Sequence, residues 1–526
     1  MAIARTGILA KIVGLSLLSV TTTAAQASFF DQMKDAYQDI EKTVEKNIKS
    51  LTHKDNAAIE PEATPVAEAS KKTPPATLEK DIILPEHWQS ELVVEPTFND
   101  EIFVLQSGLQ HSQTVLLVHG LGQNGYKDWL KVIPALEKNY HVLTLDLPGF
   151  GNSAAPSGRY SPTNYAQVLS WLVDTYAKGK AAVVGHSMGG AVALRFASGF
   201  PDKVSNLTLV DAAGILERTA FLKHMTRLPI RPEQAPKPLQ KLGTQLVDLG
   251  NSVIELSALT PDPTRILNTN SKYWNRVFNG KPNANAAIAL VDENFNDAIH
   301  TLPHNTSIIW GAEDPVAPLR TGIMLAGRLA NADLAIIEGA GHVPMNSHTD
   351  QFNQLLGDAI SSNNTKPVIS TPLEGTPEDL DCENITGKTY SGHYRHITLE
   401  DCTGVVLKNI TANSLSIEDS VIEMQNVTVN SDSTALETTE SVIVATNLTL
   451  AGTIGIMTDG SRLDLAGVSI QGKQAAIKID NSSRILFSVS DMTSPLFTGN
   501  VHGDFREKDR TLDEVLFAKN NPTQDK

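Results

Sequence analysis

Positive charge, cysteine and aromatic side chains are all scarce in this sequence. Its 526 residues carry 43 Lys and Arg against 59 Asp and Glu, which gives a formal net charge of −16. This deficit argues against a general nucleic-acid-binding protein, which presents a basic face to the phosphates. Aromatic residues make up 6% of the chain and hydrophobic residues 41%, so the composition is nevertheless that of folded protein.

The sequence contains only two cysteines, Cys382 and Cys402. Two thiols alone cannot supply the four ligands of a structural zinc site. In an oxidising compartment they could form a disulfide, whose loop closure contributes about 3 kcal/mol in the chain-entropy model.

Long apolar segments are also lacking, and the apolar run near the amino terminus is too short to span a bilayer comfortably. Residues 1–27 have the features of a secretory signal peptide, with a membrane anchor as the alternative. Arg5 and Lys11 stand at its start, the run 12–20 is apolar, and Ala25-Gln26-Ala27 is typical of a cleavage site. The sequence therefore predicts an exported protein, either periplasmic, on the cell surface or secreted.

The length predicts at least two domains. Residues 28–54 show the three- and four-residue spacing of an amphipathic helix. Residues 55–80 are rich in Ala, Pro, Glu, Thr and Lys and indicate a linker. A second linker is predicted at 362–380, which leaves 81–361 as the first large domain.

Within 81–361, short apolar runs alternate with longer helical stretches, which is typical of a mostly parallel α/β sheet. About 90 residues without clear strands, roughly 215–305, predict a helical insertion over the carboxyl edge of that sheet. The eight strand candidates are Leu92–Val94, Ile102–Leu105, Val115–Val118, Val142–Leu145, Ala182–Val184, Leu207–Val210, Ser307–Trp310 and Leu334–Ile337.

Residues 381–503 change character and contain a repeat of about twenty residues. Short alternating runs precede each repeated triplet, which favours a stack of coils that bury their apolar faces together. A right-handed parallel β-helix is the first interpretation, and a β-sandwich is the alternative. The two cysteines would then lie on adjacent coils, and 504–526 would form a closing helix and tail. The triplets are Asn384-Ile385-Thr386, Asn409-Ile410-Thr411, Asn426-Val427-Thr428, Asn447-Leu448-Thr449 and Gly467-Val468-Ser469.

The strongest chemical signal is the motif Gly185-His186-Ser187-Met188-Gly189, which follows an apolar strand and precedes a small-residue helix. A G-x-S-x-G elbow presents a serine hydroxyl sharply at a strand-to-helix turn, so Ser187 is the candidate nucleophile. The backbone amide of Met188 would face a developing oxyanion. The alternative is a tight glycine turn whose serine only caps the helix.

A second apolar strand runs into His119-Gly120-Leu121-Gly122. A loop after an early strand supplies the second oxyanion donor in this architecture, and the amide of Leu121 is the candidate. His119 stands in the wrong place in the chain order for the catalytic base. We expect it to hydrogen-bond within the loop instead.

The base is expected after the last strand, where Gly339 and Gly341 flank a loop that leads to His342. Its Nε2 would accept the serine proton and return it to the leaving group. The rivals nearest in sequence are His300, His304 and His348, and none of these follows a strand through a glycine loop.

The acid is expected after the seventh strand. Asp314 is the candidate because it stands four residues beyond Trp310 and is fixed by Pro315. It would orient the imidazole and stabilise the positive form. Glu313 is a close rival, and Asp211, after the sixth strand, is the other.

Together these motifs resemble the α/β-hydrolase superfamily over residues 90–360, in particular its lipase, esterase and carbon–carbon-bond hydrolase branch with a helical cap. The resemblance covers about half of the chain and implies the triad and oxyanion roles given above. It does not extend to 28–80 or 370–526. The matching segments are His119-Gly120-Leu121-Gly122, Asp146-Leu147-Pro148-Gly149-Phe150-Gly151-Asn152-Ser153, Gly185-His186-Ser187-Met188-Gly189-Gly190, Gly311-Ala312-Glu313-Asp314 and Gly341-His342.

These features predict hydrolysis of carboxylic esters, of small molecules or lipids, through an acyl-enzyme that needs no metal or organic cofactor. Two alternatives remain: cleavage of another acyl or carbon–carbon bond by the same triad, or a surface-binding protein that acts through its repeats. The repeats would then contact the envelope or carbohydrate. Residues 221–241 of the insertion are basic, which would attract an anionic substrate or simply form a solvated face.

Overall fold

The computed structural model describes residues 84–217, 271–361 and 377–511, with short gaps at 481–482, 494–496, 499–500 and 508–509. The predicted signal peptide, amphipathic helix and first linker lie outside these residues. So do the basic segment of the insertion, most of the second linker and the end of the tail.

The first domain contains an eight-stranded sheet in the order β1-β2-β4-β3-β5-β6-β7-β8. The first two strands are antiparallel to their neighbours, and the other pairs are parallel. All eight predicted strands are present. They are β1 (Gln89–Glu95), β2 (Asp100–Ser107), β3 (Thr114–Val118), β4 (His141–Leu145), β5 (Ala181–His186), β6 (Val204–Val210), β7 (Thr306–Gly311) and β8 (Ala332–Ile337).

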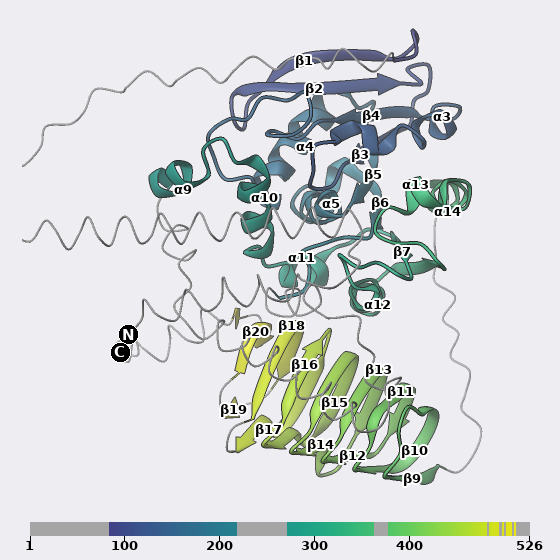
Figure 1. Ribbon diagram of the computed structural model, residues 1–526, viewed down its shortest axis with the longest axis vertical. Helices are drawn as coiled ribbons and strands as arrows, with labels where there is room; N and C mark the ends of the chain where they lie inside the picture. The colour runs from purple at the N-terminus through teal and green to yellow at the C-terminus, as the bar shows by residue number, and fades with distance from the viewer. Residues whose placement is uncertain are drawn as a thin grey trace, which may run out of the picture.

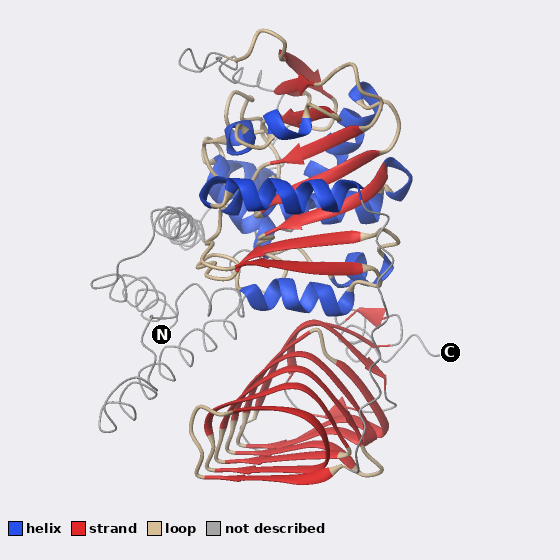
Figure 2. Cartoon of the chain, turned by 90° about the vertical axis from the view of Figure 1, so that its right-hand side faces the viewer, coloured by secondary structure: helices blue, strands red, loops and turns tan. Residues whose placement is uncertain are grey.

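Helices cover both faces of this sheet, as Figure 2 shows. Successive strand residues point to opposite sides, so Leu116 and Val118 join one buried cluster whereas Val115 and Leu117 join the other. The first cluster includes α4 (Pro162–Tyr176), α5 (Met188–Gly199) and α12 (Leu319–Arg328). The second includes 3₁₀-helix η1 (Gly125–Trp129), α3 (Ile133–Leu136), α13 (Pro344–Ser347) and α14 (Thr349–Ser361). The short 3₁₀-helix η2 (Pro201–Lys203) joins α5 to β6.

The described part of the predicted insertion is helical. It consists of α9 (Ser271–Phe278), α10 (Pro282–Val291) and α11 (Asn296–Thr301). Asn285 fixes α10 to the first domain, because its buried side chain accepts from Tyr160 N at 3.0 Å and donates to Gly158 O at 2.7 Å. The side chain of Trp274 donates to the same asparagine at 2.9 Å.

The carboxy-terminal domain is a stack of parallel coils, which confirms the predicted β-helix (Figure 2). Residues 18 to 22 positions apart lie side by side on neighbouring coils: Val421 pairs with Thr403 and Val442, and Arg462 pairs with Val442 and Arg484. The strands are β9 (Glu378–Glu383), β10 (Thr389–Glu400), β11 (Thr403–Ala412), β12 (Ser414–Glu418), β13 (Val421–Asn430), β14 (Thr434–Thr439), β15 (Val442–Asp459), β16 (Arg462–Ala466), β17 (Ser469–Asp480), β18 (Arg484–Thr493), β19 (Phe497–Thr498), β20 (Val501–Glu507) and β21 (Arg510–Thr511).

The repeated asparagines mark one bend of each coil. Asn409, Asn426 and Asn447 all have φ between +54° and +56°, a left-handed conformation that asparagine tolerates better than most residues. Their side chains also form a ladder, because Asn426 donates to Asn409 at 3.0 Å and Asn447 donates to Asn426 at 3.2 Å. The triplets therefore repeat for a structural reason.

The two ends of the coil stack differ from one another. Near the first coils, Cys382 and Cys402 form a disulfide, and neighbouring strands place them on adjacent coils. At the other end, residues 504–507 continue strand β20, and residues 510–511 form β21. The predicted closing helix is therefore wrong for these residues, because their backbone pairs with the preceding coil and with itself.

The later coils pack against the first domain, whereas the earlier coils extend away from it (Figure 1). Arg320, at the start of α12, donates to Thr446 Oγ1 at 3.0 Å and to Asp464 Oδ1 at 2.9 Å. Asn447 donates to Ile323 O of the same helix at 2.7 Å. Three apolar residues of the coils join the hydrophobic cluster of the first domain: Ala466, Leu486 and Val489.

Glycines on both sides permit this close approach. A Cβ on Gly327 of α12 would lie 2.2 Å from the Asn447 side chain. A Cβ on Gly467 would lie 2.9 Å from Met324 of α12. Gly467 replaces the asparagine of the last triplet at a bend with φ of +66°, so the departure from the repeat falls where the other domain docks.

Candidate active site

Ser187 occupies a strained turn between β5 and α5. Its φ of +53° and ψ of −121° are rare for a residue with a Cβ. Two glycines make the turn possible. A Cβ on Gly185 would lie 2.2 Å from Gly189 O, and a Cβ on Gly189 would lie 2.3 Å from Val118 O. The turn therefore holds the serine above the end of the sheet, as the motif predicts.

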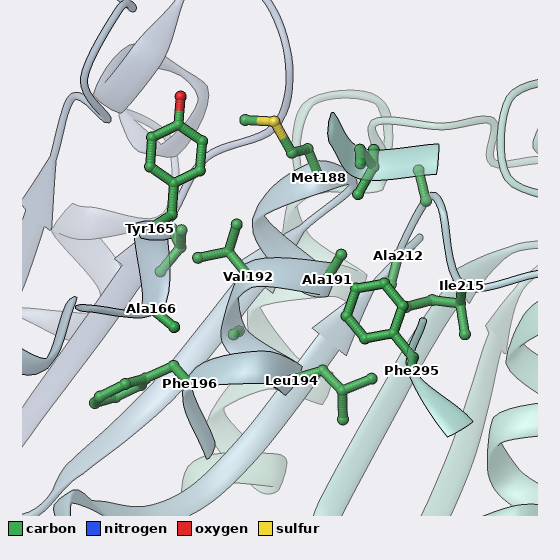
Figure 3. Close-up of a cluster of buried hydrophobic side chains, with 14 of the residues drawn as sticks. Tyr165, Ala166, Met188, Ala191, Val192, Leu194, Phe196, Ala212, Ile215 and Phe295 are labelled. Atoms are coloured by element: carbon green, nitrogen blue, oxygen red, sulfur yellow. The ribbon is translucent and has the colours of Figure 1, made fainter. Parts of the chain in front are cut away.

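The helix that follows the serine is anchored by apolar side chains. Figure 3 shows Ala191, Leu194 and Phe196 of α5 among the side chains of the buried cluster. All three are fully buried. This packing fixes the helix that carries Met188 at its first position, and with it the turn.

The structure brings together the three side chains that the sequence predicts to form a triad. The distance between His342 Nε2 and Ser187 Oγ is 2.9 Å. On the other side of the ring, His342 Nδ1 lies 2.7 Å from Asp314 Oδ2. These are hydrogen-bond distances, and a proton on Nδ1 leaves Nε2 free to accept the hydroxyl proton of Ser187.

Hydrogen bonds between the Asp314 carboxylate and the backbone of its own loop fix the position of the acid. Asp314 Oδ1 accepts from Val316 N at 2.7 Å and from Ala317 N at 3.0 Å, while the other oxygen faces His342. The Asp314 side chain is inaccessible to solvent. The rival Glu313 is exposed, and the rival Asp211 is buried beside Asp314 but has no hydrogen bond to the imidazole.

The predicted oxyanion loop lies directly against the serine. A Cβ on Gly120 would be 3.0 Å from Ser187 Cβ, so the glycine lets the loop that carries Leu121 approach. His119 is buried; its Nε2 accepts from Leu147 N at 2.9 Å, and its Nδ1 therefore donates to Gly120 O at 2.7 Å. The side chain thus holds two loops together.

Sequence reasoning missed the part played by His186, although it stands inside the serine motif. Its Nε2–H donates to the backbone oxygen of His342 at 2.7 Å, which ties the base loop to the serine turn. Burial and, second to it, the positive charge of a protonated His342 lower the pKa of His186 to about 4. The imidazole is therefore neutral near pH 7.

Asp146, in the segment Asp146–Ser153, holds two neighbouring backbone segments together through its carboxylate. It accepts from Tyr126 N at 2.6 Å and from Asn152 N at 2.8 Å. A Cβ on Gly125 or Gly151 would overlap its carboxyl group. Burial raises the pKa of Asp146, a shift that nearby positive charge and these hydrogen bonds oppose.

The other histidines near the carboxyl end of the domain lie elsewhere. His300 contacts Asp491 of the coil domain, and His304 bonds to Pro201 O at 2.9 Å. His348 bonds to Ser347 Oγ. Within the described ranges, no group of three or more His, Cys, Asp or Glu side chains is placed to hold a metal ion, and no helix has the length and apolar character to cross a membrane.

The comparisons bear on the fold of the first domain. Residues 113–348 match the family model described as alpha/beta hydrolase fold. The first domain therefore has the α/β-hydrolase fold, which confirms the resemblance seen in the sequence. The match does not include the coil domain.

The proteins to which the chain is similar include named hydrolases and an uncharacterized protein. An uncharacterized protein of Mycobacterium tuberculosis is 28% identical over 45% of this chain and 72% of its own length. A 2-hydroxy-6-oxononadienedioate/2-hydroxy-6-oxononatrienedioate hydrolase of Pseudomonas sp. is 26% identical over 50% of this chain and 93% of its own. A monoacylglycerol lipase of Xenopus laevis is 28% identical over 47% and 75%. The two named enzymes are both hydrolases, and their names give different substrates.

Proposed function

We propose that the protein is an exported serine hydrolase that cleaves carboxylic esters through an acyl-enzyme. The observation that carries the proposal is the continuous line of hydrogen bonds from Ser187 through His342 to Asp314. An alcohol needs an adjacent base to act as a nucleophile near pH 7. The buried carboxylate orients that base and stabilises its charge.

The chemistry proceeds in two halves. His342 Nε2 takes the proton as Ser187 Oγ attacks the ester carbonyl carbon, and the oxyanion lies between the amides of Leu121 and Met188. The C–O bond to the alcohol then breaks, and the imidazolium gives its proton to the departing oxygen. Water repeats the sequence on the acyl-enzyme and releases the carboxylic acid.

An ester is favoured as substrate because the monoacylglycerol lipase among the relatives cleaves one. The second candidate is cleavage of a carbon–carbon bond beside a ketone, favoured by the relative named for a 2-hydroxy-6-oxo dicarboxylate. The same fold and triad serve both reactions.

The test is a fluorophosphonate probe combined with a panel of short- and long-chain p-nitrophenyl esters. Wild type should be labelled and turn over at least one ester, whereas Ser187→Ala should do neither. Equal labelling of the two proteins would refute the serine nucleophile. Labelling with no ester turnover would favour the carbon–carbon substrate, which a 2-hydroxy-6-oxo-dienoate assay would detect.

Export and the partners of the coil domain are separate proposals. Amino-terminal sequencing of protein from the periplasm or medium should find a chain that begins after Ala27. A full-length chain confined to the cytoplasm would refute export. Binding of the intact Ser187→Ala protein to isolated envelope or polysaccharide would support the proposed envelope or carbohydrate contact, and no binding to either would refute it.

A further inference from the structure

The coil domain contacts the first domain next to the loop that carries the acid of the triad. Helix α12 begins at Leu319, five residues after Asp314. It packs on β7 and β8 of its own domain, where Met324 and Leu325 are fully buried. It also packs on β15 of the coils, which lie outside the family match at 113–348. The helix therefore lies between the hydrolase sheet and a domain that the matched fold does not contain.

The acid loop is fastened to the start of this helix. Asp314 Oδ1 accepts from Val316 N at 2.7 Å and from Ala317 N at 3.0 Å. Ala317 O in turn accepts from Trp310 Nε1 at 3.0 Å. The Trp310 ring lies against α12, since a Cβ on Gly322 would be 2.8 Å from it. A shift of the first turn of α12 would therefore move the backbone amides that hold the carboxylate.

Arg320, the second residue of α12, ties this first turn to two neighbouring coils. Its Nε donates to Thr446 Oγ1 at 3.0 Å, and its Nη2 donates to Ala445 O at 3.0 Å and to Asp464 Oδ1 at 2.9 Å. A planar guanidinium makes such bonds as one rigid fork, which fixes direction as well as distance. The side chain is 19% exposed, so water competes little for these bonds.

The surface that receives Arg320 is held on both sides. Ala445 and Thr446 lie in β15, which pairs here with β13 on one side and with β16 on the other. The next residue, Asn447, donates to Ile323 O of α12 at 2.7 Å. This second bond fixes the middle of the helix, whereas Arg320 fixes the turn beside the acid loop. The coils thus offer a firm support at the place where the acid needs one.

We propose that Arg320 is a positioning residue of the triad, through which the coil domain holds the first turn of α12 and with it the carboxylate of Asp314. The inference rests on the proposed serine-hydrolase function. Within the described ranges, the side-chain hydrogen bonds of Arg320 all go to the coils. Its effect on the imidazole of His342 must therefore pass through Asp314.

The test is the rate at which a fluorophosphonate labels Ser187 in wild type, Arg320→Ala, Asp314→Ala and the double variant, all full-length and below the temperature at which any of them unfolds. Arg320→Ala should slow labelling between about tenfold and a hundredfold, as a small misplacement in an active site does. Labelling should still reach the wild-type endpoint, because the molecules remain folded. In Asp314→Ala the same substitution should change the rate less than about twofold, since the group that it positions is gone.

Three further variants separate positioning from a general loosening of the interface. Arg320→Lys keeps the charge and should recover part of the rate. Thr446→Val removes one acceptor from the coil side and should give the same pattern with a smaller effect, so it replaces Arg320→Ala if that protein does not fold. His300→Ala removes a contact with Asp491 of the coils near the last residue of α12, and should leave the labelling rate unchanged. Asp314→Asn is the second background for the cycle.

Proton NMR gives a readout that lost stability alone does not move. His342 Nδ1 lies 2.7 Å from Asp314 Oδ2, and the proton of this charge-assisted bond should resonate far downfield in wild type. Arg320→Ala should shift or remove the resonance, whereas His300→Ala should leave it in place. An unchanged labelling rate in Arg320→Ala, a defect that persists undiminished in the Asp314→Ala background, or an equal defect in His300→Ala would overturn the inference.

The outcomes also distinguish this inference from the proposed function. Labelling that depends on Ser187 but not on Arg320 refutes only the positioning role. Labelling that is the same in Ser187→Ala refutes the serine hydrolase and the positioning role together. Because labelling requires no ester, a wild type that turns over none still tests the role of Arg320.

Discussion

At the scale of single residues, the site places a neutral histidine, His186, next to the base His342, which becomes positively charged during the reaction. His186, neutral and fully buried, donates to the backbone of the base loop. A charged imidazole at this position would repel the imidazolium that forms on His342 during the reaction. Burial therefore serves both the position of the base and its ability to accept a proton.

This burial predicts acid sensitivity. An unfolded chain protonates His186 near pH 6.5, whereas the native protein does so only near pH 4. Between these values the unfolded state binds more protons, so stability is lost as pH falls through the window, by at most about 3 kcal/mol. Urea unfolding of wild type at pH 7 and pH 4 should show this loss.

The matched variant is His186→Gln, which retains a donor near Nε2 but cannot titrate. Its unfolding free energy should fall less than that of wild type over the same pH range. His141, whose pKa burial also lowers to about 4, contributes equally to both proteins and cancels. An identical loss of stability in the two proteins would contradict the prediction.

Sequence order was enough to predict Ser187, His342 and Asp314 because each follows a strand whose end lies at the same sheet edge. The structure brings all three together. The part played by His186 could not be predicted. It depends on a contact between loops that are more than 100 residues apart, the bond from His186 to the backbone oxygen of His342.

At the scale of elements, glycines decide where backbones meet. Both α5 and α12 contain a glycine that lies so close to another segment of the protein that a Cβ atom would not fit between them. Glycine lowers the stability of an isolated helix by about 1 kcal/mol relative to alanine. These glycines therefore serve the close approach that they allow and not the helix itself.

Helix α5 offers a matched pair of glycines for a test. Gly189→Ala would place a Cβ 2.3 Å from Val118 O, so we expect a loss of about 1 to 3 kcal/mol in stability, as for other overpacked sites. A fall in ester kcat/KM should accompany it because the serine turn and the oxyanion loop are forced apart. Thermal unfolding and kinetics measure both effects.

The control is Gly199→Ala, at the far end of the same helix, where no atom lies within 4 Å of the added Cβ. This substitution should raise the melting temperature slightly or leave it unchanged, since alanine favours the helix. Equal effects of the two substitutions would show that contact with β3 is not what requires the glycine at 189.

The coil repeat was readable from the sequence at this scale, whereas its end was not. Four of the repeated triplets begin with an asparagine at a left-handed bend, and this spacing indicated the period of the coils, which are present. The closing helix predicted from 504 was wrong because residues 501–507 pair with strand β18 of the preceding coil. The hydrogen bonds that this edge offers favour another strand, a tertiary effect that local pattern does not contain.

At the scale of the whole molecule, the two domains share one hydrophobic cluster and a polar contact built on α12. The sequence predicted neither the shared cluster nor the polar contact, because the residues of an interface do not follow a regular spacing along the chain. The helix α12 begins five residues after Asp314, so the coils support the element next to the acid loop. We therefore expect the two domains to unfold as one cooperative unit.

Arg320 tests this cooperativity. Its side chain is 19% exposed and donates to two coils, through Ala445 O at 3.0 Å, Asp464 O at 3.1 Å and the Asp464 carboxylate. Arg320→Ala would remove these bonds to the coils, and a hydrogen bond to a charged group typically contributes about 1.5 to 3 kcal/mol. Calorimetry should then resolve two transitions where wild type shows one.

The matched control is Arg395→Ala, which removes an exposed arginine–aspartate pair with Asp379 on the first coils. Exposed pairs contribute little to stability, and this one lies away from α12. Its calorimetric profile should keep a single transition. If Arg320→Ala also keeps a single transition with an unchanged midpoint, the contact at α12 does not couple the domains, and the coils would support the hydrolase only through their apolar residues.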